Sequence, residues 1–297
     1  MRTGGIGFFD SGVGGLTVLK ECEAVTCGLP IYYYGDNQRA PYGNRPIYEM
    51  RAYVREAFEF FRRAQVVAAV VACNTVTALL VDELRSEYAF PIVGVEPAVL
   101  PAARECRRVT VLATKATCES RRLHELIERA KILFPNVTVT VLACPRLAGE
   151  IEKGCLCGSW NVAGCLPSAD TDGVVLGCTH YIFVKDEIEK FYGARVFHGN
   201  GAVANRLSWI LQNRGIKKSG STYFDHFCTP TEKLSALSFI FAQKKPKSGI
   251  KKNKKTNEIG VRFWKVKNAQ SLYFVGSGRL FNRKFYERMF AFCQFQK

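Results

Sequence analysis

Two hydrophobic patterns alternate along the chain from residue 5 to about residue 212. Short runs of small and β-branched residues without polar alternation predict strands that are buried on both faces. Segments with helical spacing follow most of them, and strands that alternate with helices predict α/β layers with parallel sheets. The predicted strands are 5–9, 30–35, 66–72, 91–95, 109–113, 137–143, 172–177 and 195–197, and the predicted helices are 16–23, 48–63, 77–88, 120–133, 149–154 and 202–212.

Two of these strands end in a cysteine that polar side chains follow, in the motifs Cys73-Asn74-Thr75 and Cys178-Thr179-His180. Open α/β sheets bind ligands at the carboxyl ends of their strands. A helix that begins directly after a cysteine favours its thiolate. The two motifs therefore predict a pair of thiols that face each other across one cleft. Two buried structural cysteines are the alternative, which the polar neighbours disfavour.

The first strand leads into a glycine-rich turn at residues 10–15, DSGVGG. Backbone N–H groups in such a turn can approach an anion closely. The turn lacks the Gly-Lys-Ser/Thr ending of a Walker loop and is not GxGxxG. A phosphate site, a carboxylate site and a plain strand-to-helix turn all remain open at this point.

The net charge of +16 is distributed unevenly. Residues 244–297 hold 15 Lys and Arg against 2 acids, a net +13, whereas residues 1–243 hold 27 against 24, a net +3. The lysine run 244–255 predicts a solvated, disordered linker. Aromatic and basic residues interleave beyond it, a mixture that can bind single-stranded nucleic acid. The alternative is a poorly structured basic tail without a function.

Length and cysteine usage bound the class of protein. A chain of 297 residues favours two domains. No apolar stretch approaches the roughly 18 residues of a membrane span, and Asp10 interrupts any signal peptide, so we expect a cytoplasmic protein with reduced thiols. A zinc site is conceivable where four of the twelve cysteines crowd together, but the spacing of Cys155 and Cys157 is too short for a zinc knuckle, so we expect no metal. The crowded cysteines are Cys144, Cys155, Cys157 and Cys165.

Five short motifs stand in one order: residues 10–15, Gly35-Asp36, Pro41-Tyr42-Gly43, Ala72–Thr75 and Gly177–His180. With them, residues 4–243 resemble the glutamate racemases of the aspartate/glutamate racemase family. The resemblance implies cofactor-independent interconversion of L- and D-glutamate, which supplies D-glutamate for peptidoglycan. It also implies two similar α/β domains with the active site in the cleft between them. The domains would be 1–95 with 200–243, and 96–199, followed by the basic tail 244–297, which we expect to be disordered or poorly structured.

Racemisation needs a base on one face of Cα and an acid on the other, because the planar carbanion is reprotonated from the opposite side. By the resemblance, Cys73 and Cys178 are that pair, and Asp10, His180 and Glu152 assist proton transfer. No lysine is positioned for a pyridoxal Schiff base, so no cofactor is expected. The positions that match substrate-binding residues are Asp10, Ser11, Asp36, Tyr42, Gly43, Asn74, Thr75, Thr114, Thr117, Ser120, Thr179 and His180.

The sequence departs from the family pattern in its second half. Ile182 stands where proline is usual, Gly149 replaces an apolar residue, and His198 lies in a stretch that differs from the expected Asp-Ser-Gly. The segment between Glu152 and Cys178 is also short, which suggests a truncated helix. A catalytically impaired relative, an aspartate racemase and a nucleic-acid-binding protein therefore remain as alternatives. The expected partners are a small-molecule substrate, glutamate, and a second copy in a homodimer, without a membrane.

Overall fold

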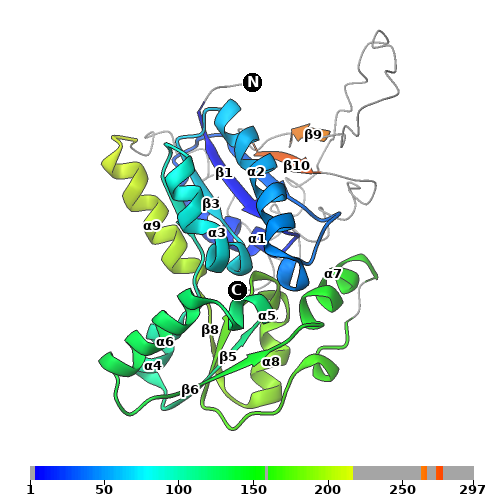
Figure 1. Ribbon diagram of the computed structural model, residues 1–297, viewed down its shortest axis with the longest axis vertical. Helices are drawn as coiled ribbons and strands as arrows, with labels where there is room; N and C mark the ends of the chain where they lie inside the picture. The colour runs from blue at the N-terminus through cyan, green and yellow to red at the C-terminus, as the bar shows by residue number, and fades with distance from the viewer. Residues whose placement is uncertain (1–3, 158–159, 217–261, 266–271, 277–297) are drawn as a thin grey trace, which may run out of the picture.

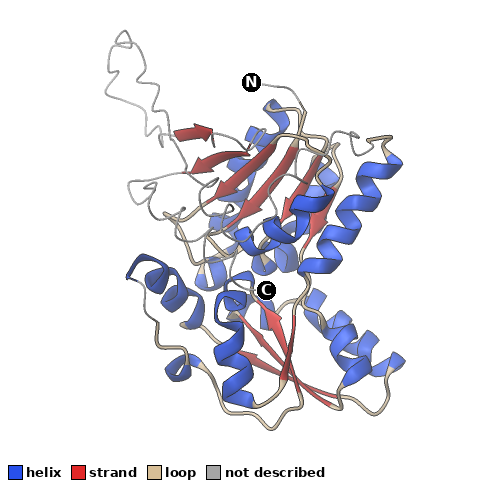
Figure 2. Ribbon diagram, turned by 180° about the vertical axis from the view of Figure 1, so that it is seen from behind, coloured by secondary structure: helices blue, strands red, loops and turns tan. Residues whose placement is uncertain are grey.

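The computed structural model describes residues 4–157, 160–216, 262–265 and 272–276. Two sheets lie one above the other along the long axis of the molecule, each with helices on both faces (Figures 1 and 2). The predicted architecture of two similar α/β halves with mostly parallel sheets is confirmed. In the described part of the chain, each helix is too short or too polar to cross a membrane.

The first sheet has the strand order β4-β3-β1-β2-β10-β9. Its first four strands are mutually parallel, and β10 continues the parallel arrangement beside β2, with Leu272 opposite Ile31. β9 pairs with β10 in the antiparallel direction. The strands are β1 (Ile6–Asp10), β2 (Ile31–Gly35), β3 (Ala68–Val71), β4 (Ile92–Gly94), β9 (Arg262–Lys265) and β10 (Leu272–Gly276).

β9 and β10 belong to the segment for which the sequence predicted a poorly structured tail. These nine residues form strands, unlike the prediction. Without them β2 would be an edge strand, and the free N–H and C=O groups of an edge strand can pair with a further strand, here β10. The lysine run 244–255 and the rest of the tail lie outside the described residues, and so does most of the region proposed for nucleic-acid binding.

The second sheet has the order β6-β5-β7-β8, and all its neighbours are parallel. In each half the first and third strands lie side by side at the centre, the second strand flanks the first and the fourth flanks the third. The halves therefore share one topology, in which the strand order reverses between the two central strands. The strands are β5 (Arg108–Ala113), β6 (Thr138–Ala143), β7 (Gly173–Gly177) and β8 (Arg195–Phe197).

Burial on both faces explains why the strands read as uninterrupted apolar runs. All five residues of β1 are buried. Phe8 packs into the hydrophobic cluster that includes α1 and α9, whereas Phe9 points the other way into the cluster of α2 and α3. The helices of the first half are α1 (Gly15–Cys22), α2 (Ile47–Arg63), α3 (Asn74–Glu87) and α9 (Asn200–Asn213), with the 3-10 turns η1 (Glu23–Val25) and η2 (Tyr42–Asn44).

Besides the four-residue helix Lys115–Cys118, the second half contains two helices that the sequence reading omitted. α4 (Val99–Glu105) is short and contains Pro101, and α8 (Lys185–Tyr192) is short and follows a 3-10 segment without a break. The remaining helical elements are α5 (Lys115–Cys118), α6 (Arg121–Leu133), α7 (Leu147–Cys157), η3 (Ala163–Cys165) and η4 (Thr179–Val184).

The two halves share part of their hydrophobic core. Val13 and Leu16 of the first half and Tyr181 and Phe183 of the second belong to one cluster of buried residues. The chain returns to the first sheet through α9, and Asn200 Nδ2 donates to Thr17 Oγ1 of α1 at 3.1 Å. The carboxyl ends of the central strands therefore meet across a packed boundary.

Candidate active site

Both cysteine motifs lie at carboxyl ends of central strands. Cys73 follows β3 and is the N-cap of α3, and Cys178 follows β7 and is the N-cap of η4. Both are buried, at 5% and 7% exposure. The charge of Cys178 contributes to the pKa of Cys73, so the two sulfurs lie within electrostatic reach of each other. The ends of central strands, where the strand order reverses, are where open α/β sheets bind ligands.

The first sulfur lies in a buried, acid-lined setting. The Sγ atom of Cys73 is 3.5 Å from Ser11 Oγ. Burial raises the pKa of Cys73 to about 12, and the negative charge of Asp10 adds to the effect, against the backbone N–H of Val76 and the Ser11 hydroxyl, which lower it. The sequence had suggested that the start of α3 favours the thiolate. Burial and Asp10 outweigh the helix start, and Cys73 is a thiol at neutral pH.

Asp10 is held by the glycine-rich turn that follows it. Its Oδ2 atom accepts hydrogen bonds from the backbone N–H groups of Gly12 at 3.0 Å and Gly15 at 2.9 Å. Its Oδ1 atom is buried without a partner. Burial raises the pKa of Asp10, opposed by His180 and by the two backbone donors. Two of the turn's N–H groups thus bind a carboxylate of the chain itself, which argues against the phosphate site left open by the sequence.

The second sulfur belongs to a chain of polar groups that crosses between the halves. Cys178 Sγ is 3.8 Å from His180 Nδ1, and His180 Nε2 is 2.7 Å from Glu152 Oε1. The same carboxylate oxygen accepts from the backbone N–H of Val13, in the first half, at 3.0 Å. Burial lowers the pKa of His180, but the hydrogen bonds with Cys178 and Glu152 outweigh it and place the pKa well above its ordinary value. Cys178 therefore has an imidazolium beside it.

Glycine is required where the turn meets these groups. A Cβ atom on Gly12 would lie 1.9 Å from Glu152 Oε1, and one on Gly14 would lie 2.7 Å from His180 Nδ1 and 2.6 Å from the Thr179 hydroxyl. The sequence reading gave the turn an anion-binding role but missed this contact with the other half. The density of glycines was the available signal.

Three threonine hydroxyls form a buried cluster between the halves. Thr75 Oγ1 is 3.0 Å from Thr114 Oγ1, which donates to Thr117 Oγ1 at 3.0 Å, and Thr117 is in turn 3.4 Å from Thr75. Gly43 lies against them, since a Cβ atom there would be 2.6 Å from Thr114 Cβ. The structure thus brings these four predicted residues together from η2, α3 and α5.

Asp36 and Tyr42 form a buried pair. Tyr42 donates to Asp36 Oδ2 at 2.5 Å, and Arg39 Nε donates to Asp36 Oδ1 at 2.9 Å. The pair fixes the loop that carries Gly43. The next residue after Asp36, Asn37, donates to Glu152 Oε2 at 3.4 Å, and the sequence reading missed it although it follows the second strand directly.

Ser120 and Asn74 bind backbone groups. The Ser120 hydroxyl caps α6, accepting from Leu123 N at 3.3 Å and donating to Thr117 O at 2.7 Å. Asn74 Nδ2 donates to Val95 O at 3.3 Å and so ties the start of α3 to the segment after β4.

The three departures from the family pattern make none of the contacts described above. Ile182 is partly buried against the core within η4, a Cβ on Gly149 would meet no atom within 4 Å, and His198 lines a cavity between the two halves. α7 spans Leu147–Cys157, which is longer than the predicted 149–154, and it carries Glu152. Among the described residues, no three His, Cys, Asp or Glu side chains gather where they could hold a metal ion.

The chain is similar to known proteins in sequence. A family model described as Asp/Glu/Hydantoin racemase matches residues 14–207. The glutamate racemase of Clostridium novyi (strain NT) is 36% identical over 223 residues, which are 71% of this chain and 85% of that protein. Glutamate racemase 2 of Bacillus subtilis (strain 168) is 34% identical over 253 residues, 80% of this chain and 94% of that protein.

A solved structure is similar over the same region. The Escherichia coli glutamate racemase, in complex with L-glutamate and the activator UDP-MurNAc-Ala, aligns with a TM-score of 0.64 and 31% identity over 71% of this chain and 83% of that one. The order of the motifs, the paired α/β halves and these likenesses lead to one conclusion. The chain belongs to the Asp/Glu/Hydantoin racemase family.

Proposed function

We propose that this protein is a cofactor-independent glutamate racemase that supplies D-glutamate for peptidoglycan in the cytoplasm. One observation carries the proposal: two buried thiols, one from each half, lie within electrostatic reach of each other at the carboxyl ends of the central strands. Several relatives that are about a third identical carry the name glutamate racemase, which favours glutamate over other amino acids.

The chemistry follows from the different surroundings of the two sulfurs. The Cys178 thiolate, beside the His180 cation, would remove the α-proton from one face of the substrate. The Cys73 thiol, which burial and Asp10 keep protonated, would deliver its proton to the opposite face. One S–H bond breaks as another forms, so the enzyme is left with the protons exchanged and ready for the reverse reaction. No electron is gained or lost.

The substrate's carboxylates would be held by neutral donors. The hydroxyls of Thr75, Thr114 and Thr117 are buried in one cluster, with Gly43 beside it. Such groups bind a carboxylate without placing a lysine or arginine against the carbanion.

The direct test is racemisation of L-glutamate in deuterium oxide, followed by circular dichroism and by mass spectrometry of the α-position. We expect deuterium to enter Cα as the optical signal decays, and Cys73→Ser and Cys178→Ser each to abolish the decay. Cys106→Ser is the matched control. Cys106 is half-buried at the amino ends of β5 and β7, away from the site, where its Sγ atom is 3.5 Å from Asp172 O. Full racemisation by either site variant would refute the two-thiol mechanism.

The same assay separates the alternatives. Equal rates with L-aspartate would make the chain an aspartate racemase, and no turnover of either amino acid would indicate the impaired relative. Nucleic-acid binding by the tail stays a prediction, and so does the homodimer.

A further inference from the structure

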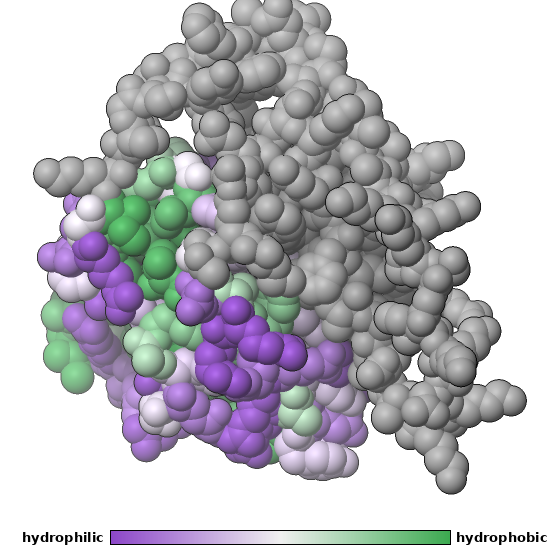
Figure 3. Space-filling view, turned by 90° about the horizontal axis from the view of Figure 1, so that it is seen from above, coloured by the Kyte–Doolittle hydropathy of each residue, from purple (hydrophilic) through white to green (hydrophobic). Residues whose placement is uncertain are grey.

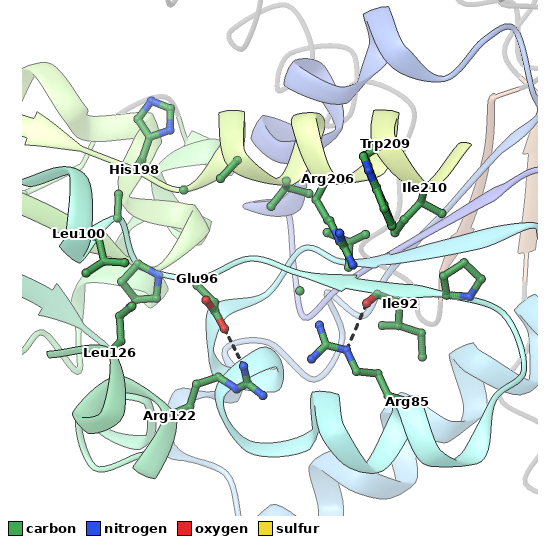
Figure 4. A pocket seen from close by; sticks show the side chains of 18 of the residues that line it. Arg85, Ile92, Glu96, Leu100, Arg122, Leu126, His198, Arg206, Trp209 and Ile210 are labelled. Atoms are coloured by element: carbon green, nitrogen blue, oxygen red, sulfur yellow. Dashed lines mark hydrogen bonds and ion pairs between the residues drawn. The ribbon is translucent and has the colours of Figure 1, made fainter. Parts of the chain in front are cut away.

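The two halves are joined by two chain crossings that touch each other. One crossing leads from β4 to α4 through Glu96, and the other leads from β8 to α9 through Gly199. A Cβ atom on Gly199 would lie 2.0 Å from the carbonyl oxygen of Glu96, so only glycine allows this contact. A cavity of about 840 Å³ opens beside the crossings, lined by residues of both halves (Figure 4). The junction is therefore narrow and has space around it.

Arg122 bridges this junction from the second half. It lies in the first turn of α6, and its Nη1 atom donates to Glu96 Oε1 at 2.6 Å. Its Nη2 atom donates to Asp82 of α3, in the first half, at 2.6 and 2.5 Å. One guanidinium thus binds a carboxylate on the crossing and another on the opposite half. The Arg122 side chain is 26% exposed, whereas its partners Asp82 and Glu96 are 74% and 43% exposed, so the pairs lie at the surface of the junction.

Both helices in this bridge begin at the candidate active site. Cys73 is the N-cap of α3, and Ser120, whose hydroxyl binds Thr117 O, is the N-cap of α6. The crossing that holds Glu96 also supplies Val95 O, the acceptor for Asn74 beside Cys73. The bridge therefore joins two helices that both begin at the candidate active site.

We propose that Arg122 is a positioning residue for the racemase reaction. By binding Asp82 and Glu96 together, it favours the arrangement of the halves in which both sulfurs reach one substrate carbon. The inference rests on the proposed function. It requires no contact between Arg122 and the substrate.

The test compares Arg122→Gln with Arg121→Gln. Arg121 is the adjacent residue, its side chain is 90% exposed, and its ion pair with Glu125 stays within α6, so the control removes the same charge without touching the junction. A half-exposed ion pair commonly shifts an equilibrium up to about fivefold. When fewer molecules have the binding-competent arrangement of the halves, the apparent affinity for substrate falls by the same factor. We therefore expect Arg122→Gln to raise the KM for glutamate about three- to tenfold and to leave kcat within about twofold. Arg121→Gln should leave both unchanged.

Salt and a conservative variant distinguish positioning from general damage. High salt screens ion pairs, so KM of the unchanged chain and of Arg121→Gln should rise more steeply between about 0.05 and 1 M NaCl than KM of Arg122→Gln. Arg122→Lys should recover only part of the affinity, because a single ammonium cannot replace the two-ended guanidinium. Thermal melts establish that each variant is folded.

The outcomes are separable. An inactive unchanged chain refutes the proposed function. An active unchanged chain with Arg122→Gln indistinguishable from Arg121→Gln refutes the bridge. A fall in kcat and melting temperature with no change in KM or its salt dependence also refutes it, because that pattern is general destabilisation.

Discussion

A single methyl group added at Gly12 should disable the second thiol without unfolding the chain. The Cβ of Gly12→Ala would lie 1.9 Å from Glu152 Oε1 and 2.8 Å from His180 Nε2. Glu152 is a flexible side chain, so it can move aside, but it then gives up its contacts with His180 and with Val13 N. The cost therefore falls on the site more than on the fold.

The size of the effect follows from the contacts that are lost. A hydrogen bond to a charged group contributes about 1.5 to 3 kcal/mol, and about 1.4 kcal/mol is a factor of ten, so kcat/KM should fall roughly 10- to 100-fold. The pKa of His180 also loses the support of Glu152 and should fall. The imidazolium then deprotonates earlier, so activity should disappear at a lower pH than in the unchanged chain.

Gly149→Ala is the matched control because it makes the same change in the helix that carries Glu152. A Cβ at Gly149 meets nothing within 4 Å. Alanine is favoured over glycine inside a helix by about 0.5 to 1 kcal/mol, so this variant should melt about 1 to 3 °C higher with unchanged activity.

Glutamate racemisation across pH 6 to 10 and thermal melts provide the measurements. Unchanged kcat/KM in Gly12→Ala would refute the role given to the bridge from Glu152 to His180. A lower melting temperature of Gly149→Ala would show that a Cβ atom at this position does not have the open space around it that the structure gives.

Three further predictions concern charge and packing in the site. Asp10→Asn should lower kcat/KM at least about tenfold. Because the pKa of Asp10 is raised in the folded state, its ionisation costs stability as pH rises above the ordinary pKa of 3.8, so the variant should melt progressively higher than the unchanged chain above about pH 4. A difference in melting temperature that stays constant with pH would contradict this. His180 has a raised pKa, so its stabilisation is complete below about 6.5 and is lost as pH rises through the folded-state value. Urea unfolding of His180→Gln should thus show a larger deficit at pH 6 than at pH 9, and the reverse order would refute it. Gly43→Ala places Cβ 2.6 Å from Thr114 Cβ and should raise KM roughly tenfold through overpacking; an unchanged KM would argue against this contact at the cleft.

The sequence was informative where one strand and its following residues decide the structure. Runs such as 68–71 are apolar without alternation because helices cover both faces of the sheet, so the α/β class could be predicted from them. Figure 3 shows a view in which hydrophobic residues on the described surface are bordered by hydrophilic ones, which no linear pattern indicates. α4 and α8 were missed because both are short: α4 contains a proline, and α8 directly follows the 3-10 segment Thr179–Val184.

Contacts between segments far apart in sequence were beyond the local patterns. The backbone N–H of Val13 donates to Glu152, 139 residues away in the sequence. Because the donor is a backbone group, the contact does not depend on the side chain at position 13 and cannot be predicted from it. The pKa of Cys73 is another example: the helix after it was predicted from residue 77 and begins at Asn74, but burial and Asp10, not the helix start, raise the pKa of the thiol. Similarly, nine residues of a lysine-rich tail form strands because β10 pairs with the edge of β2 and β9 pairs with β10.

A reversible reaction between two halves of the same topology would suit two sulfurs with identical surroundings, yet the neighbours of Cys73 and Cys178 differ. The order of strands places Cys73 and Cys178 at equivalent positions in the two halves, as the proposed approach to opposite faces of Cα requires. If both neighbours were carboxylates, both sulfurs would rest as thiols and no base would be present; if both were imidazolium ions, both thiols would ionise and no acid would remain. In the proposed mechanism these two neighbours assign the roles: burial and Asp10 raise the pKa of Cys73, which serves as the acid, and His180 Nδ1 lies 3.8 Å from the Sγ atom of Cys178, which would serve as the base. The shared topology supplies the geometry, and the difference between the two neighbours would decide which sulfur is acid and which is base.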